Sequence, residues 1–167
     1  MDELRTLLAT DHRRTLEFFF VHLQDVTETG VDRRELLYNA SVLAHYAQVS
    51  TCATSDMPTP TSLARVFDQY VLDGSLADDP EMMETAGAQC LLLAGFFEDQ
   101  MRVRHNVRWY ATLGAGFYHR AAERARSSGN AQVMAAMAQH FEPWRQRHAR
   151  LSRELRDQPY LLVQSRN

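Results

Sequence analysis

The chain has 167 residues and a mass of 19.2 kDa, a size that fits one ordinary domain with a hydrophobic core. Its basic side chains are 18 arginines, and lysine is absent. Enzymes that need a Schiff-base lysine, a phosphate-binding P-loop lysine or a lysine general base are therefore excluded. Isoleucine is absent as well, and because both missing residues have AT-rich codons, we expect a bacterial source with a high-GC genome.

The overall composition is that of a soluble globular domain, with 45% hydrophobic and 23% charged residues. The N-terminus is acidic at Asp2 and Glu3, where a secretory signal is basic. The longest apolar stretch, residues 90–97, is far shorter than the roughly 18 residues needed to span a bilayer. Cys52 and Cys90 lie in apolar, helix-like segments, which predicts buried free thiols. These features predict a cytoplasmic protein that does not enter a membrane.

The net charge of −3 hides an uneven distribution along the chain. Residues 1–100 hold 17 acidic residues and 6 arginines, a net charge of −11, whereas residues 101–167 hold 4 acidic residues and 12 arginines, a net charge of +8. One interpretation is that acidic N-terminal helices pair with basic C-terminal helices within one fold. The other is that the arginine-rich part presents a binding face to an acidic partner, which would be a protein, a nucleic acid or an anionic ligand.

Apolar residues recur at three- and four-residue steps along most of the chain, and no segment alternates with period two. With no internal repeat and no linker, this pattern predicts a single all-α domain, residues 1–167, built as a bundle of five to six helices. The first helix is expected between Asp2 and Gly30. A carboxylate variant of the capping box, Asp32 with Glu35, opens the second.

The middle of the chain carries a loop and a strong helix start. Residues 51–61 predict a loop, and residues 63–70 predict a short third helix. Asp79 is then a typical N-cap, with Pro80 at the first helical position. A fourth, central helix is expected to continue without interruption to Met101.

Two further helices are predicted after this one. Asn106 caps the fifth helix, which should reach about Arg126. Small residues around Gly114 should let another helix approach closely, with the fourth helix the first choice. The dipeptide at 129–130 is expected to separate the fifth helix from the last one, residues 131–158, in which Pro143 should produce a kink.

Residues 98–119 carry the densest group of candidate binding residues. Arginine forks bind carboxylates or phosphates, and aromatic faces anchor a protein partner or stack on bases. The alternative is a helix C-terminus neutralised by cations, next to core aromatics. A second arginine run, at 145–156, forms a diffuse band, so specific nucleic-acid binding is not expected. The candidate partner- or anion-binding residues are Arg102, Arg104, His105, Arg108, Trp109 and Tyr118.

Histidines and carboxylates give only weak metal-binding patterns. His119 and Glu123 lie one helical turn apart, and His45 and Cys52 lie two turns apart, so each pair offers two ligands on one face. Neither pair has a third ligand, and the Glu-x-x-His motif of di-iron bundles does not occur. A polar contact or a surface pair is the favoured interpretation of both, and no catalytic residue is assigned.

Two segments resemble known families. The string LRTLLATDH, residues 4–12, resembles the start of bacterial heme oxygenases, and the resemblance implies that His12 ligates heme iron and that the glycines around 114–116 face the heme. The block LAGFF, the following arginine-rich bend and the next helix, together residues 90–121, resemble an uncharacterised family of helical proteobacterial proteins. That resemblance implies no activity, but it places the centre of the molecule in this block.

These patterns favour a non-enzymatic regulatory or adaptor protein that binds a protein partner through an arginine and aromatic surface and needs no cofactor. A homodimer is left open, because periodicity does not show which apolar faces stay uncovered. The alternative is a helical-bundle binder of heme, a metal or a small ligand, with oxygenase-like activity.

Overall fold

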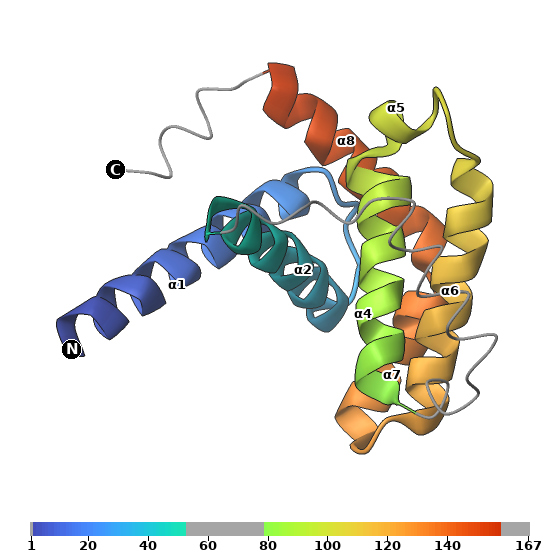
Figure 1. The fold of residues 1–167 in the computed structure, drawn as a ribbon, viewed down its shortest axis with the longest axis horizontal. Helices are drawn as coiled ribbons and strands as arrows, with labels where there is room; N and C mark the ends of the chain where they lie inside the picture. Colours follow the sequence, from blue (N-terminus) through green and yellow to red (C-terminus); the bar gives the residue numbers. More distant parts are fainter. Residues whose placement is uncertain (1, 53–78, 158–167) are drawn as a thin grey trace. The chain divides into compact units, whose positions relative to one another are not determined.

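The computed structural model describes the backbone of residues 2–52 and 79–157, and the side chains of residues 13–48 and 79–157. Within these ranges the chain is helical and contains no strand, which confirms the all-α prediction (Figure 1). The predicted loop at residues 51–61 starts too early, because α2 continues through Cys52, and its remainder lies outside the described residues, as does the third predicted helix, residues 63–70. The described residues form more helices than the five to six predicted. Seven α-helices and one π-helical turn are described: α1 (Asp2–Asp25), α2 (Arg33–Cys52), α4 (Pro80–Leu91), η2 (Leu92–Phe96), α5 (Glu98–Met101), α6 (Val107–Arg124), α7 (Ser128–Gln139) and α8 (Phe141–Asp157).

The helices belong to two compact units. The first unit contains α1, α2 and the part of α8 from Arg150 onward, and the second contains α4 to α7 and the part of α8 that ends at Ala149. None of the described helices is long and apolar enough to cross a membrane.

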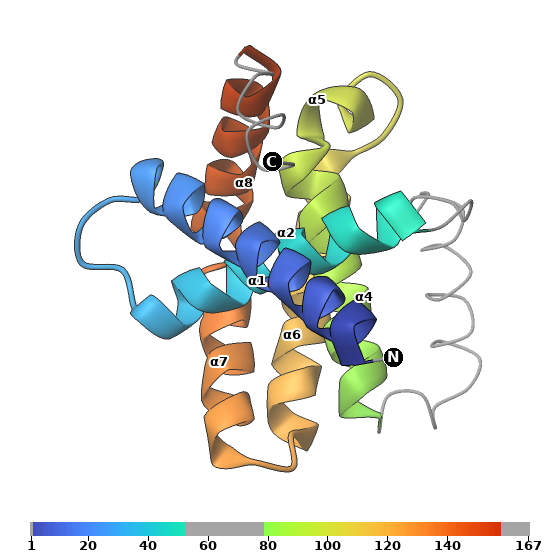
Figure 2. The ribbon, with the colours of Figure 1, turned by 90° about the vertical axis from the view of Figure 1, so that its left-hand side faces the viewer.

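In the first unit, α1 packs against α2, and Figure 2 shows the two helices crossing. Arg150 on α8 donates a hydrogen bond of 3.1 Å to the carbonyl oxygen of Val26, just beyond the end of α1. This bond satisfies one of the carbonyl groups that a helix end leaves without an intrahelical partner. The buried apolar side chains of this unit are Phe19, Leu23, Val26, Leu36, Ala40, Leu43, Ala44, Leu151 and Leu155.

The turn between α1 and α2 follows the sequence prediction. Gly30 has a φ of +97°, a conformation that L side chains rarely adopt, so glycine is the residue that the turn requires. The side chain of Asp32 then accepts a hydrogen bond of 2.7 Å from the backbone N–H of Arg34. The predicted start of the second helix is confirmed at this carboxylate.

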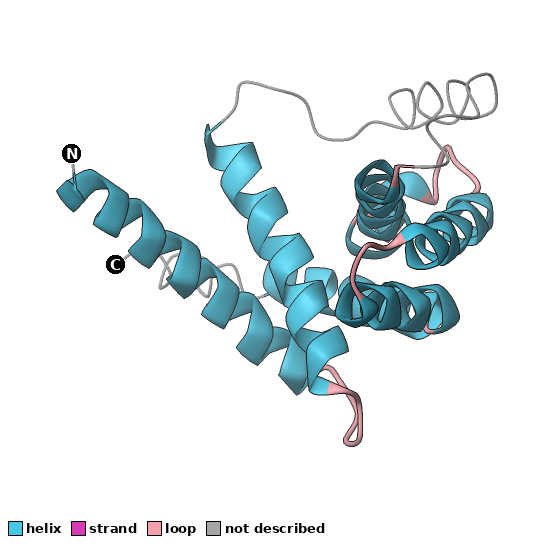
Figure 3. Cartoon of the chain, turned by 90° about the horizontal axis from the view of Figure 1, so that it is seen from below, coloured by secondary structure: helices cyan, strands magenta, loops and turns pink. Residues whose placement is uncertain are grey.

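In the second unit, α6 packs against both α4 and α7, and Figure 3 views these helices nearly end-on. Gly114 makes the contact between α6 and α4 possible. A Cβ atom on Gly114 would lie 2.7 Å from the Cβ of Cys90 and 2.5 Å from the Cζ of Phe141, closer than real Cβ atoms approach. The predicted close approach of the fourth helix is therefore confirmed at Gly114.

The fourth predicted helix begins as expected but does not continue to Met101 as one α-helix. Asp79 accepts hydrogen bonds from the backbone N–H groups of Glu81 and Met82, which confirms the N-cap. The α-helical pattern then stops at Leu91, and a π-helical turn follows in which the N–H of Phe97 donates to the carbonyl of Leu92 at 2.9 Å. The short helix α5 resumes after this turn.

The last predicted helix is also divided, and its predicted start is wrong. Ser127 is the N-cap of α7, since its hydroxyl oxygen accepts a hydrogen bond from the N–H of Asn130, so Asn130 lies in the first turn. The helix ends at Gln139 with His140 as its C-cap, and α8 begins at Phe141. Pro143 stands in the first turn of α8, where its missing N–H has no intrahelical partner to lose, so it accompanies a helix start instead of a kink.

Candidate functional site

The candidate site is a tight bend between α5 and α6. The backbone N–H groups of Arg104 and His105 both donate to the carbonyl oxygen of Met101, at 3.2 and 2.9 Å, and these bonds close the turn. The side chain of Asn106 then accepts a hydrogen bond of 3.3 Å from the N–H of Trp109, which confirms the predicted cap of α6. Hydrogen bonds therefore fix the backbone of the bend both at the end of α5 and at the start of α6.

Five of the six predicted binding residues lie together on this bend. Arg102, Arg104, His105, Arg108 and Trp109 all fall within one stretch of eight residues, and each is exposed. The exposure of Trp109, 43%, is high for the largest apolar side chain.

Tyr118, the sixth predicted residue, does not belong to this surface. Its side chain is fully buried, with the ring 3.0 Å from the position of a Cβ on Gly87 and 6.1 Å, centroid to centroid, from the ring of Phe141. Trp109 and Tyr118 are nine residues apart on α6, which is about 180° around a helix, so they point to opposite sides. Tyr118 is a core residue that fixes α6 against α4.

One exposed residue at the bend, Val103, was not predicted as part of the site, whereas Tyr110 was expected among the aromatics of this segment and on the buried line of the helix. Val103 is 81% exposed, so an aliphatic side chain projects into solvent between two arginines. The buried ring of Tyr110 lies edge-on to Trp109, with centroids 4.8 Å apart, and 6.5 Å from the ring of His105. The available signal for Val103 was its position between Arg102 and Arg104, outside the apolar stripe of either helix. We call Val103, Arg104, His105, Arg108 and Trp109 the bend surface.

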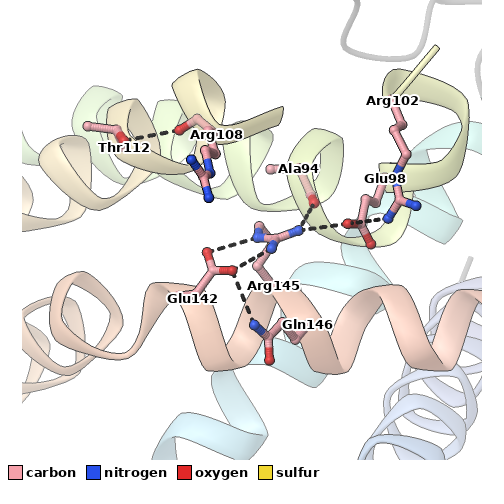
Figure 4. Close-up of polar contacts among 8 residues, drawn as sticks. All are labelled: Ala94, Glu98, Arg102, Arg108, Thr112, Glu142, Arg145 and Gln146. Carbon is pink, nitrogen blue, oxygen red and sulfur yellow. Dashed lines mark hydrogen bonds and ion pairs between the residues drawn. The ribbon is translucent and has the colours of Figure 1, made fainter. Parts of the chain in front are cut away.

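A network of arginine and glutamate side chains lies beneath the bend (Figure 4). Arg145 on α8 is at its centre and is only 13% exposed. Its Nη1 atom donates to the carbonyl oxygen of Ala94 and to Oε1 of Glu98, both at 3.1 Å. Its Nε and Nη2 atoms donate to the two carboxylate oxygens of Glu142, and the Nε bond is 2.9 Å long. Arg145 therefore joins α8 to the π-helical turn and to α5.

The two carboxylates of this network, Glu98 and Glu142, have lowered pKa values. Burial alone would raise the pKa of Glu98, but hydrogen bonds from Arg102 and Arg145 outweigh it, and the pKa is lowered. The hydrogen bond from Arg145 also lowers the pKa of Glu142, and the charge of Arg108 contributes to the same shift. The hydrogen bond to Glu142 raises the pKa of Arg145 in turn.

A glycine allows this network to form. A Cβ atom on Gly95, in the π-helical turn, would lie 3.0 Å from the Cβ of His148 and 3.1 Å from the carbonyl oxygen of Arg145. Such contacts bring the turn against the backbone of α8, so the side chain of Arg145 can reach the carbonyl of Ala94. π-Helical turns occur frequently at functional sites, and this one is separated from the bend only by the short helix α5.

The predicted metal-binding residues do not form a complete site in the described part of the chain. Nε2 of His119 lies 3.3 Å from Oε1 of Glu123, and both side chains are exposed. The two residues therefore form the surface pair that was the favoured interpretation. The side chains of His12 and Cys52 lie outside the described residues. Among the described side chains, no group of three or more His, Cys, Asp and Glu residues is placed to hold a metal ion.

One pocket of about 140 Å³ is present in the second unit, between the start of α4 and the α6–α7 connection. Small-molecule sites are usually about 300–1,000 Å³, so this pocket is small for a cofactor. Cys90 lies elsewhere, buried as a free thiol, and burial raises its pKa to about 12, so it remains protonated. The pocket is lined by Pro80, Glu81, Glu84, Ala121, Ala125, Arg126, Ser127, Asn130 and Met134.

The second arginine run, on α8, makes contacts within the fold. The guanidinium of Arg147 lies over the buried ring of Trp144, 4.5 Å from its centroid, and Arg150 bonds the carbonyl of Val26. Arg145 and Arg150 therefore tie α8 to other parts of the fold, whereas the contact of Arg147 with Trp144 lies within α8.

Comparison of the chain with known protein families, curated proteins and solved structures finds no match. The chemistry of the bend is therefore the basis for assigning a function.

Proposed function

We propose that this protein is a non-enzymatic regulatory or adaptor module that binds a protein partner through the bend surface. The observation that carries the proposal is the exposure of Trp109 and Val103 beside Arg104 and Arg108 on one bend. Tryptophan and arginine are, with tyrosine, enriched among the residues that dominate the binding energy of protein interfaces.

The support beneath the bend strengthens this proposal. Binding costs less free energy when the contacting side chains are already held in place. The N–H of Trp109 is capped by Asn106, its ring rests on the buried Tyr110, and the network around Arg145 holds α5 against α8. The bend surface thus has a rigid base.

The test is a quantitative affinity purification from lysate of the source organism with four versions of the chain. The first three are the wild type, Trp109→Ala and Arg104→Glu, and the fourth is the control Arg126→Glu, which reverses another exposed arginine of the same unit. We expect a partner that the wild type and the control retain equally and that both bend variants lose. The same proteins in every eluate, or a partner lost only with the control, would contradict the proposal.

The alternative function, a binder of heme, a metal or a small ligand with oxygenase-like activity, rests on the resemblance at residues 4–12. Titration of the purified chain with hemin separates the two proposals. A Soret shift with the wild type that is absent with His12→Ala supports the heme binder, and spectra that do not differ between the two reject it. Native mass spectrometry of the same sample reports any bound ligand and whether the chain is a homodimer.

A further inference from the structure

We infer that the bend surface recognises a short segment of the partner in which a carboxylate stands next to an aromatic or aliphatic side chain. This inference rests on the proposed function and specifies the chemistry of the partner. It follows from the division of the arginines at the bend into two groups, and from the apolar side chains that lie among them.

The first group of arginines is already engaged by carboxylates of the chain itself. Nη2 of Arg102 donates to Oε1 of Glu98 at 2.9 Å, and Arg145 is hydrogen-bonded to both Glu98 and Glu142. Arg145 is only 13% exposed and has little left to offer a partner, whereas Arg102 is 63% exposed and would have to share its guanidinium group with Glu98. A partner carboxylate that bound Arg145 would compete with the contact to Glu98 that holds α5 to α8.

The second group consists of Arg104 and Arg108. Neither side chain forms an ion pair or a hydrogen bond with another side chain in the part of the chain that the structure describes, and both are exposed. The charge of Arg108 acts on Glu142 from a distance. A guanidinium group with unused donors binds a carboxylate through two parallel hydrogen bonds, a geometry that a carboxylate of a partner can supply.

Apolar contacts are available directly beside these arginines. Val103 precedes Arg104 in the chain, and Trp109 follows Arg108. A partner side chain that covers the exposed part of Trp109 would exclude water from a neighbouring arginine–carboxylate pair, and such exclusion strengthens the pair. A carboxylate with an apolar neighbour therefore fits this surface better than a carboxylate alone.

The charges around the bend favour a peptide over a nucleic acid. Glu142 is half exposed and lies on the same side of the network as Arg108 (Figure 4). The whole chain carries a net charge of −3. A nucleic acid brings a negative charge with every nucleotide and would meet repulsion from these groups, whereas a peptide presents single carboxylates at separate positions.

The test is selection of a phage-displayed library of random 12-residue peptides on the intact chain. We expect the selected peptides to be enriched in Asp or Glu adjacent to aromatic or aliphatic residues. A selected peptide is then synthesised with a fluorescent label, and its Kd is measured by anisotropy. We expect the Kd to rise roughly tenfold or more with Arg104→Ala and with Trp109→Ala, and less than about twofold with the control Arg126→Ala.

A version of the peptide with Gln or Asn in place of Glu or Asp completes the design. If Arg104 binds the carboxylate, the amide peptide binds the wild type roughly tenfold more weakly, and Arg104→Ala weakens it little further. Equal affinity for both peptides, or selected peptides without acidic residues that still depend on Trp109, overturns this inference and leaves the proposed function standing.

Three other outcomes overturn more than the carboxylate preference. Peptides that bind the wild type, Arg104→Ala and Trp109→Ala equally bind elsewhere, and they contradict the proposed function as well. A library that yields no binder overturns the inference of a short segment. A single-stranded 20-nucleotide DNA that binds more tightly than any selected peptide, and depends on Arg104, replaces the peptide with a nucleic acid.

Discussion

His148 is a buried titratable residue whose burial has a direct consequence for stability. Its side chain is fully buried on α8, and burial lowers its pKa from the ordinary value of 6.5 to about 3. The imidazole is therefore neutral in the folded chain, whereas the unfolded chain takes up a proton below pH 6.5. The contribution of His148 to the free energy of unfolding is constant above pH 6.5 and is lost progressively as the pH falls from 6.5 toward 3.

We expect replacement of His148 to change the pH dependence of unfolding. Between pH 7 and pH 5, protonation in the unfolded state should lower the free energy of unfolding of the wild type by about 2 kcal/mol. His148→Asn removes this loss, whatever its effect on stability at pH 7. Urea unfolding at both pH values measures the difference, and the exposed His45→Asn serves as the control. The same loss in His148→Asn as in the wild type would show that His148 does not cause it.

Gly114 and Gly116 form a natural pair for testing the contact between α6 and α4. A Cβ on Gly114 would collide with Phe141 and with the Cβ of Cys90, whereas a Cβ on Gly116 would meet no atom within 4 Å. We expect Gly114→Ala to lower the free energy of unfolding by about 1–3 kcal/mol through overpacking. Gly116→Ala should raise it by up to about 1 kcal/mol, because alanine favours the helix.

Thermal and urea unfolding of both glycine variants and of the wild type show whether each substitution raises or lowers the free energy of unfolding. Each variant makes the same chemical change two residues apart on one helix, so the effect of helix propensity is shared. Stabilisation by Gly114→Ala would mean that α4 and α6 do not approach as closely as the structure shows.

At the scale of helices, the starts that depend on local chemistry were predictable from the sequence. Asp32, Asp79 and Asn106 each act as the expected cap, because a short polar side chain reaches N–H groups only two or three residues away. The interruption after Leu91 could not be predicted in the same way. It depends on contacts of Gly95 and Ala94 with Arg145, a residue about 50 positions further along the chain.

In the candidate site too, some features follow from the local sequence and others depend on contacts with distant parts of the chain. A cluster of arginines and aromatics in sequence was enough to find the bend, because five of its members lie within eight residues. Helix geometry alone separates Tyr118 from Trp109, by about 180°, but which of the two faces solvent depends on the packing of α4 and Phe141 against α6. The exposure of Val103 likewise follows from the shape of the bend.

For the whole molecule, the structure shows how part of the uneven charge is neutralised. Glu98 belongs to the acidic residues 1–100, and its partners Arg102 and Arg145 belong to the basic residues 101–167. Pairing between the two parts of the chain therefore accounts for some of the arginines. Arg104 and Arg108 are exposed members of the basic part that form no ion pair with the described carboxylates, so internal pairing does not account for them.

The salt dependence of stability should separate the half-buried pairs from the exposed ones. Arg145→Met removes contacts with Glu98, Glu142 and Ala94, and we expect it to lower the free energy of unfolding by about 1–3 kcal/mol. The matched control Arg102→Met removes one exposed pair and should cost less than about 1 kcal/mol. Both costs are measured by urea unfolding in 0.1 M and 1 M NaCl.

Raising the salt concentration shortens the Debye length from about 10 Å to about 3 Å and screens exposed charges far more than half-buried ones. The cost of Arg102→Met should therefore vanish in 1 M NaCl, while more than half of the cost of Arg145→Met should remain. Because both variants replace arginine with methionine, the general effect of salt on apolar surface cancels in this comparison. A parallel loss of both costs would mean that Arg145 is as exposed to solvent as Arg102, and that the network beneath the bend does not hold α5 to α8.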